Sequence, residues 1–400
     1  MSSTTTRISL VMLLAAVMLL TGAAFAYAAP TIPVGWGWAD GPHSSYPGYC
    51  LGCHTGFAAG SPPAITAGSR PTHRDRGSNC SQCHRITMPA PPPPSRVPVT
   101  YVKGANRYAT AIAVSHASFP ATAPCVVLAT GADFPDALCA APLAKAYGGP
   151  ILLVAPGSGL TAELSAEIDR LHPSRVFVVG SERAVSAGVA AQAAAKPWAP
   201  SVTRLGGAGR FDTAGLVAHQ VKLKLGHVSK VVVAYGRNYP DALSAAPLAA
   251  AQGWPILLTE TNALPPATAV ALADSAATSS LVVGGPNAVS DAVMSMLPSA
   301  LRKGGGTRYD TCGLLADYAV SLGMKYTTLF STVGNNFPDA LAAGPMVAGR
   351  NGVLLLTDPS TVPGAISSRL ATNKMAVQSL VIVGGAVPTT CVTRMSSFLN

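Results

Sequence analysis

Short, continuous apolar runs recur through the last three-quarters of the chain, in three copies spaced by about one hundred residues. The runs cover residues 125–130, 150–154 and 176–180, then 231–235, 255–259 and 281–285, and finally a segment near Leu329, 353–357 and 381–385. Runs that are apolar at successive positions and rich in β-branched residues are typical of strands buried on both faces, as in parallel sheets.

Each copy also repeats two further signatures. The first is Arg107-Tyr108-Ala109-Thr110, with counterparts that begin at Arg210 and Arg308. The second is a Gly turn that leads into Phe-Pro-Asp-Ala-Leu or Tyr-Pro-Asp-Ala-Leu, at 131–138, 236–243 and 334–341. Pro suits the first turn of a helix, and the acid complements the positive end of the helix dipole. The order of strands and helices predicts an α/β fold of three tandem Rossmann-like βαβ repeats, over residues 101–203, 204–302 and 303–400.

The strand-to-helix turns carry no nucleotide-binding motif, because neither G-x-G-x-x-G nor a P-loop occurs at them. The repeated Asp is interpreted as a helix-start residue rather than a catalytic one. No Ser-His-Asp, Cys-His or paired-carboxylate set recurs between the copies. We therefore predict no catalytic site in the repeats.

Residues 1–29 have the pattern of a secretory signal. Arg7 gives the positive end, residues 8–20 form the apolar core, and Ala24, Ala26 and Ala28 are small residues at cleavage positions. An uncleaved signal would be the one membrane contact, since the later apolar runs are short and interrupted. The chain is thus predicted to be exported.

The charge balance favours a polyanionic partner. The chain has 27 Lys and Arg against 17 Asp and Glu, a formal charge of +10, although only 11% of its residues are charged. The positive charge comes from a scarcity of acidic residues rather than from an abundance of basic ones. Export argues against nucleic acid and leaves anionic lipid or an acidic wall polymer.

Two C-x-x-C-H motifs follow the signal. In c-type cytochromes the two thiols bond to the haem and the adjacent His coordinates the iron. Two such motifs, about thirty residues apart in an exported chain, predict two covalent c-type haems. Zinc bound by the two CxxC pairs and a disulfide within each pair are the alternatives. The attachment residues are Cys50, Cys53, Cys80 and Cys83, and the proximal ligands are His54 and His84.

A histidine also lies seven residues before each motif, at His43 and His73. The repeated H-x6-C-x2-C-H unit indicates that these two residues fill the distal positions, so both irons would be bis-His coordinated. Met88 is the alternative for one iron, and Met/His ligation would raise its potential. Residues 30–88 are too few to bury a large core, which the haems would supply. The Pro-rich segment 89–100 predicts a semi-rigid linker.

In their order, R-Y-x-T, the Pro-Asp-Ala-Leu turn with the Ala-Ala-Pro-Leu that follows, Pro-Ile-Leu-Leu and Val-Val-Gly-Gly resemble the cell-wall-binding type 2 repeat. The resemblance implies a compact pseudo-threefold unit that attaches non-covalently to an anionic secondary cell-wall polymer. Several equivalent weak sites hold a repeating polymer well. Arg107, Arg210 and Arg308 are therefore candidate polymer contacts, or else each supports an interface between repeats. Copy three departs at Cys312 and at 344–346, so polymer contacts are less expected there.

Four cysteines lie outside the haem motifs. Cys312 and Cys391 flank copy three and are the candidate disulfide, because exported thiols are able to pair. Cys125 and Cys139 are expected at a strand start and one turn into the following helix, too far apart for a bridge.

Together these features predict a dihaem cytochrome anchored in the cell wall or at the cell surface. It would relay electrons singly to other cytochromes or to an extracellular acceptor. Filled coordination positions leave no site for a substrate, which argues against haem catalysis. A haem redox enzyme or peroxidase, a haem sensor, and a structural or adhesive wall protein are the alternatives.

Replacing His43 and His73 together by Ala is expected to convert the haem irons from low-spin to high-spin, because the distal nitrogen ligand is lost. The optical spectrum of the oxidised, exported protein measures this change. A low-spin spectrum that survives both substitutions would assign the distal positions to other residues.

Overall fold

The computed structural model describes residues 97–157 and 159–400. The signal, both C-x-x-C-H motifs and the three candidate distal ligands lie outside the described residues. The described ranges comprise the end of the Pro-rich segment and the three repeats.

The repeats form three separate four-stranded sheets in which every strand pair is parallel. The first sheet has the order β3-β2-β4-β5 and comprises β2 (Cys125–Thr130), β3 (Ile151–Val154), β4 (Arg175–Val179) and β5 (Ser201–Leu205). The second has the order β7-β6-β8-β9 and comprises β6 (Lys230–Tyr235), β7 (Ile256–Thr259), β8 (Ser279–Val283) and β9 (Ala300–Lys303). The third has the order β1-β12-β10-β11 and comprises β1 (Val99–Val102), β10 (Lys325–Val333), β11 (Gly352–Thr357) and β12 (Ser379–Val383). The apolar runs of the sequence are thus confirmed as parallel strands.

Helices connect the strands and cover the sheets. The first repeat contains α3 (Arg107–Ser118), α4 (Pro135–Leu138), α5 (Ala140–Tyr147), α6 (Ala162–Leu171) and α7 (Ala187–Ala194). The second contains α8 (Arg210–Leu225), α9 (Pro240–Gln252), α10 (Pro266–Ser275) and α11 (Asp291–Ser295). The third contains α12 (Arg308–Ser321), α13 (Pro338–Gly349), α14 (Gly364–Asn373), the 3-10 helix η2 (Lys374–Ala376) and α15 (Thr389–Leu399). Within the described ranges, no helix has the length and apolar character needed to cross a membrane.

The helix starts follow the sequence signature. Helices α4, α9 and α13 each begin at the Pro of Pro-Asp-Ala-Leu, with the Asp in the first turn. Side chains of the strands alternate between two cores: Val127 and Ala129 of β2 face a core shared by all three repeats, whereas Val126 and Leu128 face one that belongs to repeat one.

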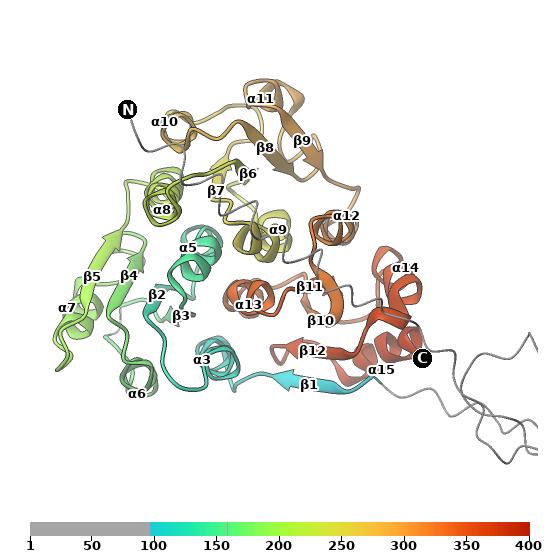
Figure 1. The fold of residues 1–400 in the computed structure, drawn as a ribbon, viewed down its shortest axis with the longest axis horizontal. Helices are drawn as coiled ribbons and strands as arrows, with labels where there is room; N and C mark the ends of the chain where they lie inside the picture. The colour runs from blue at the N-terminus through green and yellow to red at the C-terminus, as the bar shows by residue number, and fades with distance from the viewer. Residues whose placement is uncertain (1–96, 158) are drawn as a thin grey trace, which may run out of the picture. The chain divides into compact units, whose positions relative to one another are not determined.

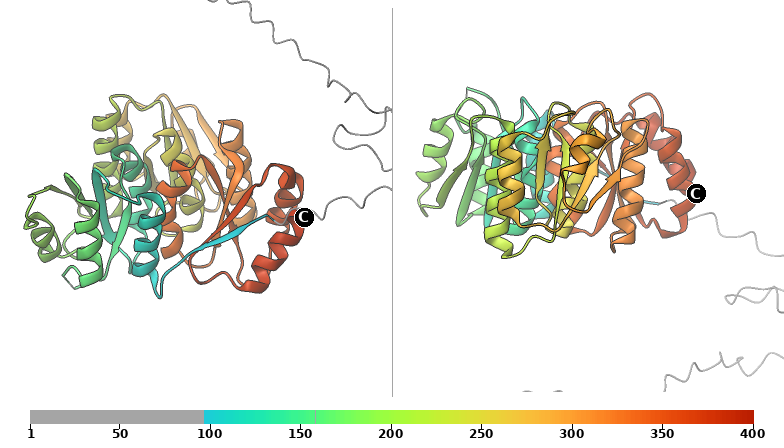
Figure 2. Two further views of the ribbon diagram at one scale, coloured as in Figure 1. Left: turned by 60° about the horizontal axis from the view of Figure 1, so that its bottom comes forward. Right: turned by 90° about the horizontal axis from the view of Figure 1, so that it is seen from above.

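The sheets do not coincide with the repeats of the sequence, because each is completed by the strand that introduces the next repeat. Strand β5 pairs with β4 and then leads into α8, and β9 pairs with β8 and then leads into α12. The counterpart for repeat three is β1, which leads into α3 and pairs with β12 in the register Val99↔Leu380. Strand β1, the cyan strand beside the red elements in the left view of Figure 2, thereby closes three consecutive repeats into a ring.

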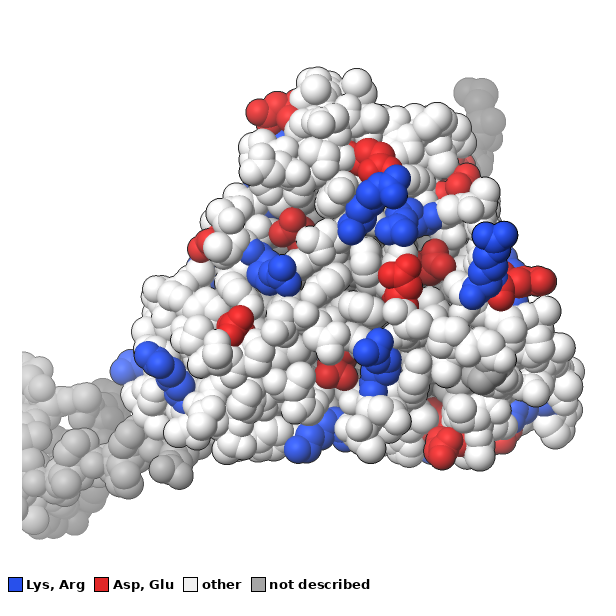
Figure 3. Space-filling view, turned by 180° about the vertical axis from the view of Figure 1, so that it is seen from behind, with Lys and Arg blue, Asp and Glu red and all other residues white. Residues whose placement is uncertain are grey.

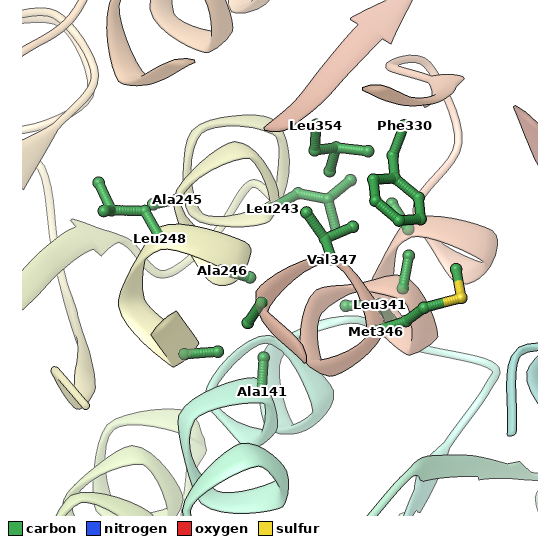
Figure 4. Close-up of a cluster of buried hydrophobic side chains, with 14 of the residues drawn as sticks. Ala141, Leu243, Ala245, Ala246, Leu248, Phe330, Leu341, Met346, Val347 and Leu354 are labelled. Carbon is green, nitrogen blue, oxygen red and sulfur yellow. The ribbon is translucent and has the colours of Figure 1, made fainter. Parts of the chain in front are cut away.

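Helices α5, α9 and α13, which lie between the first two long strands of their repeats, meet at the centre of this ring. Figure 1 shows α5, α9 and α13 side by side, with the sheets around them, and contacts join all three pairs. Ala141, Ala246 and Gly344 occupy the same position of the repeated sequence, and Figure 4 shows the two alanines directed toward α13. A Cβ atom added at Gly344 would lie 2.8 Å from the Cβ of Ala141 and 3.6 Å from that of Ala246. The departure of copy three at this residue therefore serves the packing of the central helices.

The other departure of copy three is also buried. In contrast to the predicted disulfide, Cys312 and Cys391 are free thiols. Cys312 Sγ accepts the Leu356 N–H at 3.2 Å and lies 3.5 Å from the Leu354 carbonyl oxygen, so it covers the unpaired edge of β11. Cys391 Sγ, on α15, lies 3.1 Å from Thr357 Oγ1. The two thiols have separate partners along β11. The other two thiols, of Cys125 and Cys139, are also free and buried.

Replacing Gly344 by Ala tests the central packing. In an ordinary helix interior this change stabilises by up to about 1 kcal/mol, but here the added methyl group overpacks the centre at a cost of about 1–3 kcal/mol. We expect a net loss in the free energy of unfolding, measured by denaturant titration. In an Ala141→Gly background, where the clash is removed, the same change is expected to stabilise. A gain of equal size in both backgrounds would contradict this account of the centre.

Candidate functional site

Three loops meet where the ring's strands end. They follow β2, β6 and β10, and each places one aromatic residue at the junction: Phe134, Tyr239 and Phe337. The centroids of these rings, here called the aromatic triad, are 5.5, 5.5 and 5.9 Å apart, with tilted or edge-to-face geometry. Tyr239 also donates its hydroxyl hydrogen to the carbonyl oxygen of Asn335, at 2.7 Å. The triad joins all three repeats at one edge of the unit.

The three predicted arginines surround the aromatic triad. Each guanidinium donates to the Gly carbonyl of its own repeat: Arg107 to Gly131 at 2.6 Å, and Arg210 and Arg308 to their counterparts at 2.7 Å each. Each also lies over an aromatic ring of the preceding repeat, at 5.6 to 5.9 Å from the ring centroid. The pairs are Arg107 over Phe337, Arg210 over Phe134, and Arg308 over Tyr239.

The repeated Asp makes the second link between neighbouring repeats. Asp136 accepts a hydrogen bond from the Thr213 hydroxyl of repeat two. Thr213 Oγ1 in turn accepts the Gly207 N–H at 3.2 Å. The same arrangement joins Asp241 to Thr311 and Asp339 to Thr110. Asp and Thr thus connect the helix start of one repeat to the first helix of the next, around the whole ring.

These contacts set the electrostatics of the junction. Burial raises the pKa of Asp136, Asp241 and Asp339 above the usual value of an aspartate. The Thr hydroxyl and the neighbouring Arg oppose part of this rise in the pKa, because both favour the ionised carboxylate. Each arginine therefore faces an acid as well as a ring.

The structure consequently gives the three arginines the role of supporting the interfaces between repeats, which was one of the two roles considered from the sequence. All three are half-buried, and their guanidinium groups are engaged in contacts between repeats. Contact with a polymer stays a prediction for them. The Asp–Thr link was missed, although its signal is present: the Thr of R-Y-x-T and the Asp of Pro-Asp-Ala-Leu occur together in every copy.

The face of the molecule shown in Figure 3 carries no large patch of a single charge sign. Basic and acidic side chains are interspersed on it among wide uncharged areas. Arg237 and Glu260, for example, form an ion pair in the loops of repeat two. An anion that approached this face would meet carboxylates as well as guanidinium groups.

The raised pKa of Asp241 has a consequence for stability. The folded chain keeps a proton on this carboxyl at pH values where the unfolded chain has lost it. The stability that the group contributes is complete below the unfolded pKa and is lost as the pH rises through the folded pKa. In denaturant titrations from about pH 4 to pH 7, the free energy of unfolding of Asp241→Asn is therefore expected to rise relative to that of the wild type as the pH increases.

Glu182→Gln, at an exposed acid, removes the same charge and serves as the control. The raised pKa would be contradicted if the difference in the free energy of unfolding between Asp241→Asn and the wild type did not change with pH. It would also be contradicted if the variant became less stable than the wild type as the pH rose.

Comparison with known proteins agrees with this architecture. Among curated proteins, the chain is 34% identical over 260 residues to N-acetylmuramoyl-L-alanine amidase LytC of Bacillus subtilis (strain 168), which covers 65% of this chain and 50% of the relative. It is 30% identical over 270 residues to the amidase enhancer of the same organism, which covers 66% of this chain and 35% of the relative.

Solved structures with the same fold include Cwp6 from Clostridium difficile, with a TM-score of 0.70 and 23% identity over 84% of this chain and 51% of that one. Cwp8 from the same organism has a TM-score of 0.67 and 25% identity, over 76% of this chain and 52% of that one. The chain thus spans about half or less of these relatives. The family model for cell wall binding domain 2 (CWB2) matches residues 102–190, 204–294 and 302–388, which are the three repeats. The chain therefore belongs to the cell wall binding domain 2 family, and its repeats attach it to the cell wall.

Proposed function

We propose that this wall-bound chain is a dihaem c-type cytochrome, which passes electrons singly between a donor on the cell side and another cytochrome or an extracellular acceptor. The observation that carries the proposal is the H-x6-C-x2-C-H unit, used twice between the signal and the Pro-rich linker. One such motif arises readily by chance, but two with the same upstream His do not.

The wall-binding repeats support a fixed relay rather than a diffusing carrier. They hold one end of the chain in the wall, and the Pro-rich segment 89–100 favours an extended polyproline II spacer between the repeats and the haem segment. Each iron would be reduced by one electron from its donor and reoxidised when it passes that electron on. No bond forms or breaks in such a transfer.

The polymer that the repeats bind is proposed to be anionic. The formal charge of +10 and the excess of basic over acidic residues within the repeats support this assignment. The amidase activity named for one relative is not extended to this chain, because the chain spans only 50% of that protein.

A reduced-minus-oxidised spectrum of the exported protein tests the haem proposal. We expect the sharp α band of low-spin c-type haem and two covalent haems per chain. Cys50→Ser with Cys53→Ser, and separately Cys80→Ser with Cys83→Ser, are each expected to leave one haem. The proposal fails if the protein carries no covalent haem.

A redox titration of whole cells separates a relay from incidental haem. Added oxidants and reductants too large to enter the cell are expected to change the haem spectrum of cells that display the protein. Haems that stay unresponsive in intact cells but titrate normally in the purified protein would favour a structural role for the wall protein.

A further inference from the structure

The edge of the ring opposite the aromatic triad is built differently. Here the strands begin, and α5, α9 and α13 end. The last turn or C-cap of each of these helices bonds to the first helix of the next repeat, in that helix's second half or at its C-cap. Tyr147 accepts a hydrogen bond from Gln220. Gln252 donates to the Leu322 carbonyl at 3.4 Å, and Arg350 donates to the Ala117 carbonyl at 2.8 Å. We call this the amino edge.

Aromatic rings fill the amino edge at two of the three junctions between repeats. Between repeats one and two, Arg175 and Lys224 lie 5.5 and 5.2 Å from the centroid of Tyr147. Between repeats two and three, Lys230 lies 4.8 Å from the centroid of Trp254 and 5.7 Å from that of Tyr318. Each of these junctions therefore combines basic groups with a large ring.

The third junction, between repeats three and one, is hollow. Ala117 stands in α3 where Gln220 stands in α8 and Tyr318 in α12. The space left is a cavity of about 190 Å³. Phe119, Pro345 and Met346 give it an apolar lining, and Lys145 and Arg350 are the charged residues that line it. No acidic residue lines the cavity.

The basic groups of the amino edge have no acidic partner within ion-pair distance among the described residues. In the described ranges 97–157 and 159–400, no ion pair involves Lys145, Arg175, Lys224, Lys230 or Arg350. Arg107, Arg210 and Arg308 form no ion pair among the described residues either, but each has a buried Asp close enough to act on its charge and donates to a Gly carbonyl. An anion gains more from a positive group that has no carboxylate beside it.

Arg350 is also held in place. One of its N–H groups bonds to Ala117, and its guanidinium lies 5.9 Å from the centroid of Phe330. A guanidinium has five N–H donors, so donors remain for a ligand. A side chain fixed in advance loses little conformational entropy on binding.

From these observations we propose that the amino edge binds the anionic wall polymer, and that the cavity between repeats three and one holds one sugar unit with its negative group between Lys145 and Arg350. The proposal rests on the proposed anionic character of that polymer. The apolar lining covers the C–H face of the sugar ring, while the basic groups at the other two junctions attract neighbouring units of the same polymer.

Binding of the full-length protein to purified cell walls of the producing organism tests this site. Lys145→Gln with Arg350→Gln is expected to weaken binding by about tenfold and to reduce its dependence on salt. Arg183→Gln with Arg394→Gln removes two exposed positive charges outside the amino-edge junctions and is the matched control, with an expected change below about twofold.

A second variant fills the cavity without changing the charge. Gly349 lines the cavity, and a Cβ atom added there meets no atom within 4 Å. Gly349→Leu is expected to keep the fold, checked by its unfolding transition, and to lose wall binding by about as much as the Gln pair. A purely electrostatic surface would leave the binding of Gly349→Leu unchanged and would overturn the cavity as the site.

The outcomes separate this proposal from the one on which it rests. If the wild type binds walls only at low salt and the Gln pair binds as tightly as its control, the amino edge is not the binding site. If wild-type binding does not respond to salt, the anionic polymer itself is refuted. Hydrofluoric acid extraction of the walls, which cleaves phosphodiesters, distinguishes a phosphate from a carboxylate as the negative group.

Discussion

The wall-binding unit depends on the fact that no repeat is complete alone. Each sheet takes its last strand from the segment that introduces the next repeat, and each buried Asp finds its hydroxyl partner on the next repeat's first helix. A lone repeat would expose an unpaired strand edge, which is prone to pair with other chains. It would also leave a carboxylate without its hydroxyl partner, which costs free energy wherever that carboxylate stays buried. Three copies return to the starting point, so every such group is satisfied only when the ring closes.

The two edges of the ring use their charged groups differently. At the edge where the strands end, each arginine lies over a ring of the preceding repeat and near a buried Asp, so these side chains join repeats. At the amino edge, basic groups stand without acidic partners and beside aromatic rings or a cavity. Repetition of a charged residue in the sequence is therefore a poor guide to binding, because threefold contacts within the protein demand the same repetition as a threefold site for a polymer.

The sequence predicted the strands, the helix starts and the α/β class, because these depend on local apolar runs and on the fixed φ of Pro. It could not choose between the two roles of Arg107, since that choice depends on Phe337, more than two hundred residues away. Cys312 suggested a disulfide because the sequence shows that a thiol is present but not what it contacts. In the fold, this thiol accepts a hydrogen bond from the backbone of β11. The cavity at the third junction was invisible for a related reason. It is created by the small side chain of Ala117, and a small residue gives no signal until the fold shows what stands around it.

The pairing of β1 with β12 also sets an order in time. Val99 and Leu380 lie near opposite ends of the unit's sequence, so loop closure between them carries the largest entropy cost of any strand pair in the ring. Until β12 exists, β1 has no sheet to join, and repeat one lacks the Asp339 partner of Thr110. The first strand of the ring to be synthesised can thus pair only after the last strand exists.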